Sequence, residues 1–242
     1  MTAFVLTFLV AGLACALEVL ETVMIVLAVG IERNWRDALI GTAGAVAILA
    51  VALAGVGPVL VALDEDVLHL LIGAALLWFG GQWLRKGILR MAGLKARSSA
   101  QKEFLEGQAA ARELAAPVPG KADWPARILA GKSVLLEGVE VALIVTALGA
   151  DRLVPAVLGA GVAVIAVPFA AYALRGPLMR IPESQLKYGV GVVLVSFGIF
   201  FFAEGLGLEW PLGDVALLLL AVGVWALSWA RVHHLASRVR HG

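Results

Sequence analysis

The chain has little charge and almost no cysteine. Of its 242 residues, 15% are charged and 61% are hydrophobic, and the mean hydropathy is +0.94. A soluble domain is about half apolar by composition, so this balance excludes an ordinary soluble fold. The single cysteine, Cys15, excludes an intramolecular disulfide and a membrane thiol-relay enzyme, which needs paired cysteines. We expect Cys15 to pack within its helix.

Motifs of intramembrane hydrolysis are also missing from the sequence. It contains no H-E-x-x-H, no G-x-G-D and no Ser/His pair within its apolar segments. We therefore expect neither an enzyme nor an organic cofactor, and no nucleic-acid partner. The N-terminal run 1–21 has no basic region before its apolar part, which continues past a would-be cleavage point. This pattern favours a retained membrane helix over a signal peptide.

Long apolar segments are what the sequence has instead. Several exceed the roughly 18 residues that a helix needs to cross a bilayer. Breaks between them occur at Gly57-Pro58, at Asp64-Glu65-Asp66 and at Gly176-Pro177. The sequence predicts an all-α integral membrane protein, with the lipid bilayer as its partner. The seven predicted transmembrane helices are 3–31, 37–60, 67–86, 127–149, 153–174, 187–204 and 213–231.

Lys and Arg are distributed unevenly between the two sides of such a protein. With the N-terminus outside, the inner segments 32–37, 85–132, 175–187 and 231–242 hold 18 of the 19 basic residues, and only Arg152 lies outside. The outer loops carry the acidic residues Asp64, Glu65, Asp66, Asp151, Glu204, Glu209 and Asp214. This bias follows the positive-inside rule. We expect a plasma (bacterial inner) membrane protein with its N-terminus outside and its C-terminus in the cytoplasm.

Residues 87–126 form the only sizeable segment outside the predicted spans. The stretch "SSAQKEFLEGQAAARELAA" predicts a short polar helix, which "PVPGK" ends. The segment is too short for a soluble domain with its own core. A solvated cytoplasmic connector is the favoured interpretation, and a regulatory or gating element is the alternative.

The sequence contains an internal repeat. "LEVLETVMIVLAVG" (17–30) and "LEGVEVALIVTALG" (136–149) are identical at seven of fourteen positions. The same offset of 118 or 119 continues through the next two helices. It aligns 38–48 with 156–166, Gly57-Pro58 with Gly176-Pro177, Ile72-Gly73 with Val190-Gly191, and Phe79-Gly80 with Phe197-Gly198. Each unit has three spans, so the second unit must be inverted relative to the first, an arrangement that places substrate sites near the bilayer midplane.

The repeat divides the chain into four parts. The first three-helix repeat covers 1–86 and the cytoplasmic linker covers 87–126. The inverted repeat covers 127–206, and the seventh helix with its cytoplasmic tail covers 207–242.

Each repeat carries two glutamates three residues apart, Glu18 with Glu21 and Glu137 with Glu140. Residues at this spacing share one helix face, and the pseudo-twofold axis brings the two faces together. Four carboxylates within spans cost on the order of 10 kcal/mol on insertion scales. Of the basic residues in these two helices, only Lys132 is near a pair, and it lies on another face. We therefore expect bound cations or protons to offset the cost.

Carboxylates favour hard or borderline cations such as Mn²⁺, Ca²⁺ or iron. No Met, Cys or His occupies matching repeat positions, which argues against Cu(I). Neighbouring carboxylates also share protons, so an entering metal would displace them and couple transport to protons. Candidate auxiliary residues are the hydroxyls of Thr22, Thr146 and Ser196, and Glu204, which is part of an acidic mouth with Glu209 and Asp214.

The stretch "LEGVEVALIV" resembles the R-E-G-x-E helix of the oxidase-coupled iron permeases of yeast and bacteria. Those proteins have seven helices and carry the motif in helices one and four. The resemblance implies a metal site at Glu137, Gly138 and Glu140, and at the corresponding Glu18 and Glu21. The chain departs from the motif in that Leu17 and Leu136 replace its arginine and Val19 its first glycine. The acidic pair of that family's third helix has no counterpart except Asp64-Glu65-Asp66.

Two further resemblances concern larger parts of the chain. The two-repeat layout is similar to that of Golgi-type cation/proton exchangers, although only the first glutamate of each pair matches their motif. "LLEGVEV" and "KYGVGVVLVSFGIFFFAEGLGLEWP" resemble a family of uncharacterised bacterial multi-pass membrane proteins, over most of the chain. These resemblances imply a transporter and leave its ion open.

The sequence thus predicts a secondary transporter for a metal cation, with Mn²⁺, Ca²⁺ or Fe²⁺ as substrate and proton coupling. Its predicted midplane site consists of Glu18, Glu21, Glu137 and Glu140. One alternative is a ferric iron permease that acts with an oxidase. Another is a membrane scaffold with protonated glutamates. A homo-oligomer is compatible with all three.

Overall fold

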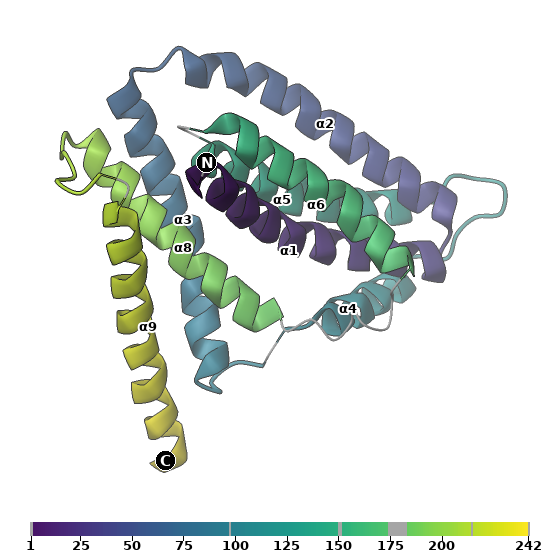
Figure 1. Cartoon of the computed structure of the whole chain (residues 1–242). Helices are drawn as coiled ribbons and strands as arrows, with labels where there is room; N and C mark the ends of the chain where they lie inside the picture. Colours follow the sequence, from purple (N-terminus) through teal and green to yellow (C-terminus); the bar gives the residue numbers. More distant parts are fainter. Residues whose placement is uncertain (1, 97, 150–151, 174–182, 214, 242) are drawn as a thin grey trace.

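Helices account for nearly all of the structure. The computed structural model describes residues 2–96, 98–149, 152–173, 183–213 and 215–241. Within these ranges the chain forms eight α-helices and no strand (Figure 1). They are α1 (Thr2–Glu32), α2 (Trp35–Val61), α3 (Glu65–Met91), α4 (Ala100–Glu113), α5 (Trp124–Leu148), α6 (Leu153–Ala173), α8 (Glu183–Gly205) and α9 (Val215–His241). Gly176-Pro177, Asp151 and Asp214, named above, lie outside the described residues.

Six of these helices are long and apolar enough to cross a membrane: α1, α2, α3, α6, α8 and α9. The predicted all-α membrane architecture is therefore supported. The fourth predicted span, 127–149, forms α5, which is not among the six. Every 18-residue stretch of α5 includes Lys132, Glu137 and Glu140. The count of seven spans thus stays a prediction, and it depends on the three ionisable residues of α5.

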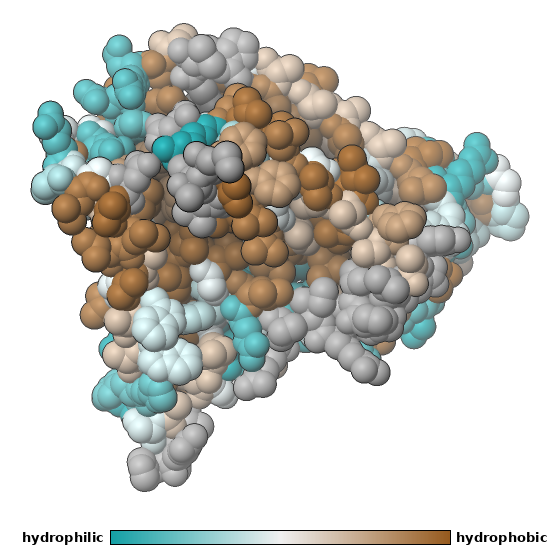
Figure 2. All heavy atoms as spheres, viewed as in Figure 1, coloured by the Kyte–Doolittle hydropathy of each residue, from teal (hydrophilic) through white to brown (hydrophobic). Residues whose placement is uncertain are grey.

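The surface agrees with a lipid environment. Large apolar side chains are exposed along the helices, for example Val51, Ile165 and Leu227, each at 75%. Figure 2 shows hydrophobic residues over most of one face, with hydrophilic residues gathered near the helix ends. A surface this apolar would aggregate in water, whereas in a bilayer it faces acyl chains.

Helices α1, α2, α5 and α6 pack in a group, with α1 against α6 and α2 against α5. The pair α3 and α8 has the most extensive contact, and α9 lies beside it (Figure 1). Close approaches depend on glycine, because a Cβ at Gly41 would overlap the backbone of Arg127 and a Cβ at Gly159 would overlap that of Phe8. Small residues at such crossings are typical of membrane helices, where close packing replaces the hydrophobic effect.

The predicted linker helix is confirmed as α4. Ser99 caps it by accepting a hydrogen bond from the Lys102 backbone N–H at 3.3 Å. The helix packs on α1, where Gly107 faces Ala28 and Ile25. Ala100 and Ala111 are fully buried. Its small side chains let α4 dock on the end of α1, so one face of the segment is not solvated. The assignment of 87–126 as a cytoplasmic connector stays a prediction.

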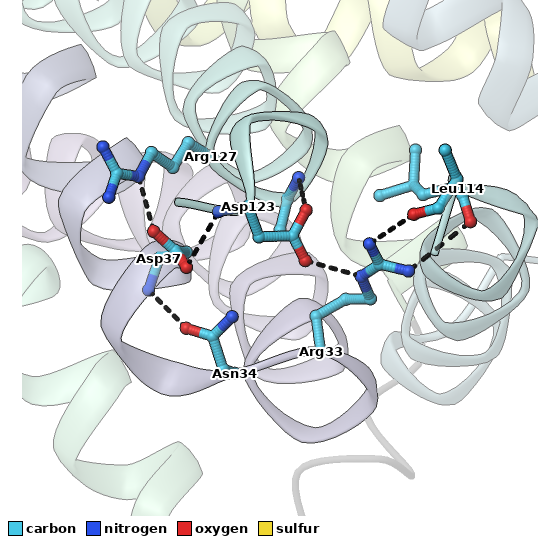
Figure 3. A network of polar contacts seen from close by, with 8 residues as sticks. Arg33, Asn34, Asp37, Leu114, Asp123 and Arg127 are labelled. Atoms are coloured by element: carbon cyan, nitrogen blue, oxygen red, sulfur yellow. Dashed lines mark hydrogen bonds and ion pairs between the residues drawn. The ribbon is translucent and has the colours of Figure 1, made fainter. Parts of the chain in front are cut away.

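A network of ion pairs holds together the end of the molecule at which α4 docks (Figure 3). Arg33 donates from Nε to Asp123 at 2.8 Å, and from Nη2 to the Ala115 carbonyl at 2.6 Å. Arg127 donates from Nε to Asp37 at 2.5 Å. The Asp123 backbone N–H also donates to Asp37, at 3.2 Å. We call Arg33, Asp37, Asp123 and Arg127 the clasp.

The clasp also determines where α5 begins. The Asp123 side chain accepts a hydrogen bond from the Ala126 backbone N–H at 3.2 Å, and Pro125 lies in the first turn. The hydrogen bond from Arg33 lowers the pKa of Asp123, and so does the bond from Ala126. Asp123 is therefore ionised at neutral pH and caps the helix as a carboxylate.

Candidate functional site

Three of the four predicted glutamates meet between α1 and α5. Glu18, Glu137 and Glu140 each offer a carboxylate oxygen, and these oxygens lie within 4.8 Å of one another. Glu18 is fully buried at 0% exposure, whereas Glu137 and Glu140 are half-buried. The i, i+3 spacing in α5 aims two of the carboxylates to one side, toward α1. We call these three residues the carboxylate cluster.

Glu18 is the least satisfied member of the carboxylate cluster. Neither of its oxygens accepts a hydrogen bond from any residue that the structure describes. A buried ionised carboxylate without hydrogen bonds is strongly destabilising unless a positive charge lies nearby. The positive charge is that of Lys187, whose Nζ lies 3.4 Å from Oε1 of Glu18.

Lys187 reaches the site from α8 and binds Glu21 more closely than Glu18. Its Nζ lies 2.6 Å from Oε1 of Glu21 and 4.9 Å from the ring centroid of Trp83. The Lys187 side chain is 14% exposed. The expectation that bound cations or protons alone offset the carboxylates overlooked Lys187, because it considered the basic residues of only the two glutamate-bearing helices. The signal was present: Lys187 is an ionisable residue at the very start of a predicted span.

Glu21 thus has a different environment from the other three glutamates. It shares the ammonium of Lys187 with Glu18, and it lies outside the group of three oxygens within 4.8 Å. The structure brings all four glutamates to one region, where Glu18, Glu137 and Glu140 form a group and Glu21 lies beside it. Glu21 is held by its ion pair with Lys187, which connects α1 and α8.

Trp83 of α3 completes the site and was not predicted. Its indole Nε1 donates to Oε2 of Glu140 at 3.2 Å, and the residue is only 4% exposed. Trp83 lines two cavities. One is apolar, with Glu140 and Thr146 in its wall. The other, of about 170 Å³, is polar and is lined by Glu21 and Lys187. Trp83 therefore separates two spaces that both border the glutamates.

Two of the three predicted hydroxyl residues have local partners. Thr146 Oγ1 donates to the Ala142 carbonyl at 2.8 Å, and Ser196 Oγ donates to the Val192 carbonyl at 2.8 Å. Both bonds lie within a single helix, as is common for Ser and Thr in membrane helices. Thr22 is half-buried on α1, next to Glu21 in sequence. Thr146 borders a cavity that Glu140 also lines.

The acidic residues at the opposite end of α3 and α8 lie far from the carboxylate cluster. Glu204 is about 25 Å from Lys187 along α8, and its Oε2 lies 3.8 Å from Nδ1 of His69. Asp64, Glu65 and Asp66 are exposed at the start of α3. Neither group contributes to the three-oxygen site. Asp64-Glu65-Asp66 therefore does not supply the acidic pair expected from the iron-permease resemblance.

Comparison of the chain with protein-family models, with curated proteins and with solved structures gives no match. The resemblances to iron permeases, to Golgi-type exchangers and to the bacterial membrane family therefore stay predictions. Function has to be inferred from the site itself, because a fold does not determine a chemistry.

Proposed function

We propose that this protein is a secondary transporter that moves a divalent metal cation through the carboxylate cluster. The observation that carries the proposal is the convergence of three carboxylate oxygens within 4.8 Å, from α1 and α5. Oxygens that share one Ca²⁺ or Mn²⁺ ion lie at most about 5 Å apart, since each bond is about 2.1–2.6 Å. The spacing therefore suits one cation bound between the two helices.

The donor set favours Mn²⁺, Ca²⁺ or Fe²⁺ as substrate. The described part of the chain brings oxygen donors, and neither thiolate nor imidazole, into this group. Oxygen-only sites favour hard and borderline divalent cations over Cu(I). Protons that the carboxylates share would leave when the metal binds, so we include proton coupling in the proposal.

Lys187 argues against a scaffold with permanently protonated glutamates. Its ammonium lies 2.6 Å from Glu21 and 3.4 Å from Glu18. If all these carboxyls were neutral, Lys187 would be a buried charge without an ionised partner, which is strongly destabilising. The ferric alternative has no support of its own, since the acidic residues of α3 are exposed at the end far from the cluster.

Inverted repeats are part of the proposal, and duplicated contacts support them. At an offset of 118 or 119, Gly12 corresponds to Gly131, and Gly41 corresponds to Gly159. Gly12 packs against Gly159, and Gly131 packs against Gly41. One contact between α1 and α6 is thus made again between α5 and α2, as a pseudo-twofold axis requires.

The contact between α3 and α8 follows the same rule. Gly73 meets Phe202 and Gly191 meets Leu84, and both partners also correspond at an offset of 118. That offset also pairs Lys187 with His69 and Trp83 with Phe201. Lys187 lies over the Trp83 ring, and the His69 ring lies 5.2 Å from that of Phe201.

In this proposal α1–α3 form one repeat and α5, α6 and α8 the other, with α5 as a seventh span and α9 outside the duplication. In the proposed orientation the N-terminus is outside and α4 is cytoplasmic. Rocking of one repeat against the other would expose the carboxylate cluster to each side in turn.

Calorimetry on the purified protein in detergent tests the proposal. Mn²⁺, Ca²⁺, Fe²⁺ and Zn²⁺ are titrated at two pH values into wild type and into Glu18→Gln/Glu137→Gln. We expect saturable binding of at least one ion, weaker at low pH and lost in the double variant. The exposed Glu106→Gln on α4 is the matched control and should bind like wild type. Failure of every ion to bind folded wild type would refute a metal transporter.

A further inference from the structure

Glu183 is a buried carboxylate that is not part of the carboxylate cluster and has no role in the proposed metal binding. It is the first residue of α8 and is fully buried at 0% exposure. Neither of its oxygens accepts a hydrogen bond from the described residues. The hydroxyl of Ser98, near the start of α4, lies close to Glu183 and donates to Glu103 at 2.9 Å. Such a carboxylate is destabilising as it stands, so it calls for a partner.

A candidate partner is on the same helix. Glu183 precedes Lys187 by four residues, which is one turn of α8. Glu followed by Lys at i+4 is the favourable orientation for an ion pair on a helix. The charged groups that act on Glu183 are Glu21, Glu103 and Lys187, and Lys187 is the only cation among them.

Lys187 has room to move between partners. Its side chain borders the polar cavity of about 170 Å³, whose wall also includes Glu103, Lys86 and Arg90. Glu183 is not part of that wall, so the cavity gives the lysine space to turn and does not itself connect it to Glu183. A lysine ammonium is a compact charge on a flexible four-carbon stem, so it can change partners by rotamer changes alone. In the structure this ammonium lies 2.6 Å from Glu21 and 3.4 Å from Glu18.

The present position of Lys187 competes with a metal. An ion bound by Glu18 would lie beside an ammonium 3.4 Å from the same carboxylate. Two cations at this separation repel one another in a buried site. The metal and the Lys187 ammonium therefore exclude each other from Glu18, although both are attracted by the same negative charges.

We propose that Lys187 is a tethered cation that neutralises Glu18 and Glu21 when no metal is bound, and that metal binding moves its ammonium to Glu183. The inference rests on the proposed function and deepens it. Both end states pair the lysine ammonium with a carboxylate, and Glu183 lacks its cation only in the metal-free state. The exchange also breaks the ion pair between α1 and α8. Because these helices belong to different proposed repeats, metal binding would remove an ion pair that connects the two repeats.

The test is Mn²⁺ affinity by calorimetry at one fixed pH, for wild type, Lys187→Met, Glu183→Gln and the double variant. Removing the competitor should tighten binding by about tenfold, and removing the receiving carboxylate should weaken it by about tenfold. Glu183→Gln should have no effect in the Lys187→Met background, since Glu183 acts only through the lysine. Lys102→Met, an exposed lysine on α4, is the matched control and should bind like wild type.

The outcomes separate this inference from the proposed function. No Mn²⁺ binding to folded wild type, with no binding of the other ions, sinks the transporter proposal itself. Binding to wild type together with unchanged or weaker binding to Lys187→Met overturns the tethered cation. So does a Glu183→Gln effect that persists in the double variant. If Lys187→Met does not fold, Glu183→Gln decides alone: weaker binding supports the exchange and unchanged binding overturns it.

Discussion

The clasp and the carboxylate cluster both bury charged side chains between the first two helices and α5, but they differ in completeness. In the clasp each acid has its own arginine: Arg33 pairs with Asp123, and Arg127 with Asp37 (Figure 3). In the cluster three carboxylates meet near a single ammonium, and neither oxygen of Glu18 is hydrogen-bonded by a described residue. Guanidinium groups match carboxylates geometrically and satisfy them within the protein.

The difference separates a structural role from a functional one. A charge network that is complete within the protein stabilises an arrangement of helices and requires nothing further. A network with excess negative charge deep in the protein is stable only with a cation or protons from outside. On this comparison the clasp holds α5 in place, and the carboxylate cluster is where a ligand binds.

The largest expected effect comes from removing charge from the cluster. In Glu18→Gln/Glu137→Gln we expect metal affinity to fall at least about 100-fold, because two anionic ligands are lost. The melting temperature of the metal-free protein should stay the same or rise, since two buried charges are removed. Calorimetry and a thermal melt in detergent measure both. A marked destabilisation would mean that the cluster is structural, like the clasp.

Breaking the clasp should have the opposite signature. Arg33→Ala leaves Asp123 buried without its arginine, and it removes the hydrogen bond to the Ala115 carbonyl. We expect the melting temperature to fall by roughly 5 °C, with metal affinity within about twofold of wild type. Arg33→Lys, which keeps the charge without the planar fork, should fall in between. A large loss of metal affinity in a folded Arg33→Ala protein would contradict the separation of roles.

Trp83→Phe tests the edge of the cluster. The substitution keeps an aromatic ring beneath Lys187 but removes the indole donor to Glu140. One hydrogen bond to a carboxylate is worth about 1.5–3 kcal/mol. If the metal binds the Glu140 oxygen to which Trp83 now donates, metal affinity should rise by about tenfold or more. If the bond orients Glu140 for the metal, affinity should fall by a similar factor. No change in titrations of the variant would place Trp83 outside the site's function.

The smallest expected effect is the pH dependence of the clasp. The hydrogen bond from Arg33 lowers the pKa of Asp123 in the folded protein, so the folded value lies below the unfolded value of about 3.9. The stabilisation is therefore fully present above about pH 4, and it is lost as the pH falls through the folded pKa. Thermal melts between pH 5 and pH 2.5 should show a steeper decline for wild type than for Asp123→Asn. Parallel curves would exclude this contribution.

Local sequence patterns predicted most of the helices. The long apolar runs and the Gly, Pro and acidic breaks placed all seven predicted spans within helices, apart from a residue or two at three ends. The polar helix of the linker was also predicted, but not its docking on α1. Docking depends on small residues of α4, such as Gly107, that contact α1. The sequence of α4 alone does not indicate which helix these small residues will contact.

What the sequence by itself determined is therefore local: apolar helices, and two glutamate pairs each on one helix face, because an i, i+3 spacing has the same meaning in any helix. Only the tertiary structure decided which charges meet. It brought Lys187 to Glu18 and Glu21, set Glu21 beside the group of three, gave Glu140 the Trp83 donor, and joined Arg33 to Asp123. These partners are 57 or more residues apart in the chain. Their meeting depends on how helices cross at glycine contacts, and no single helix carries that information.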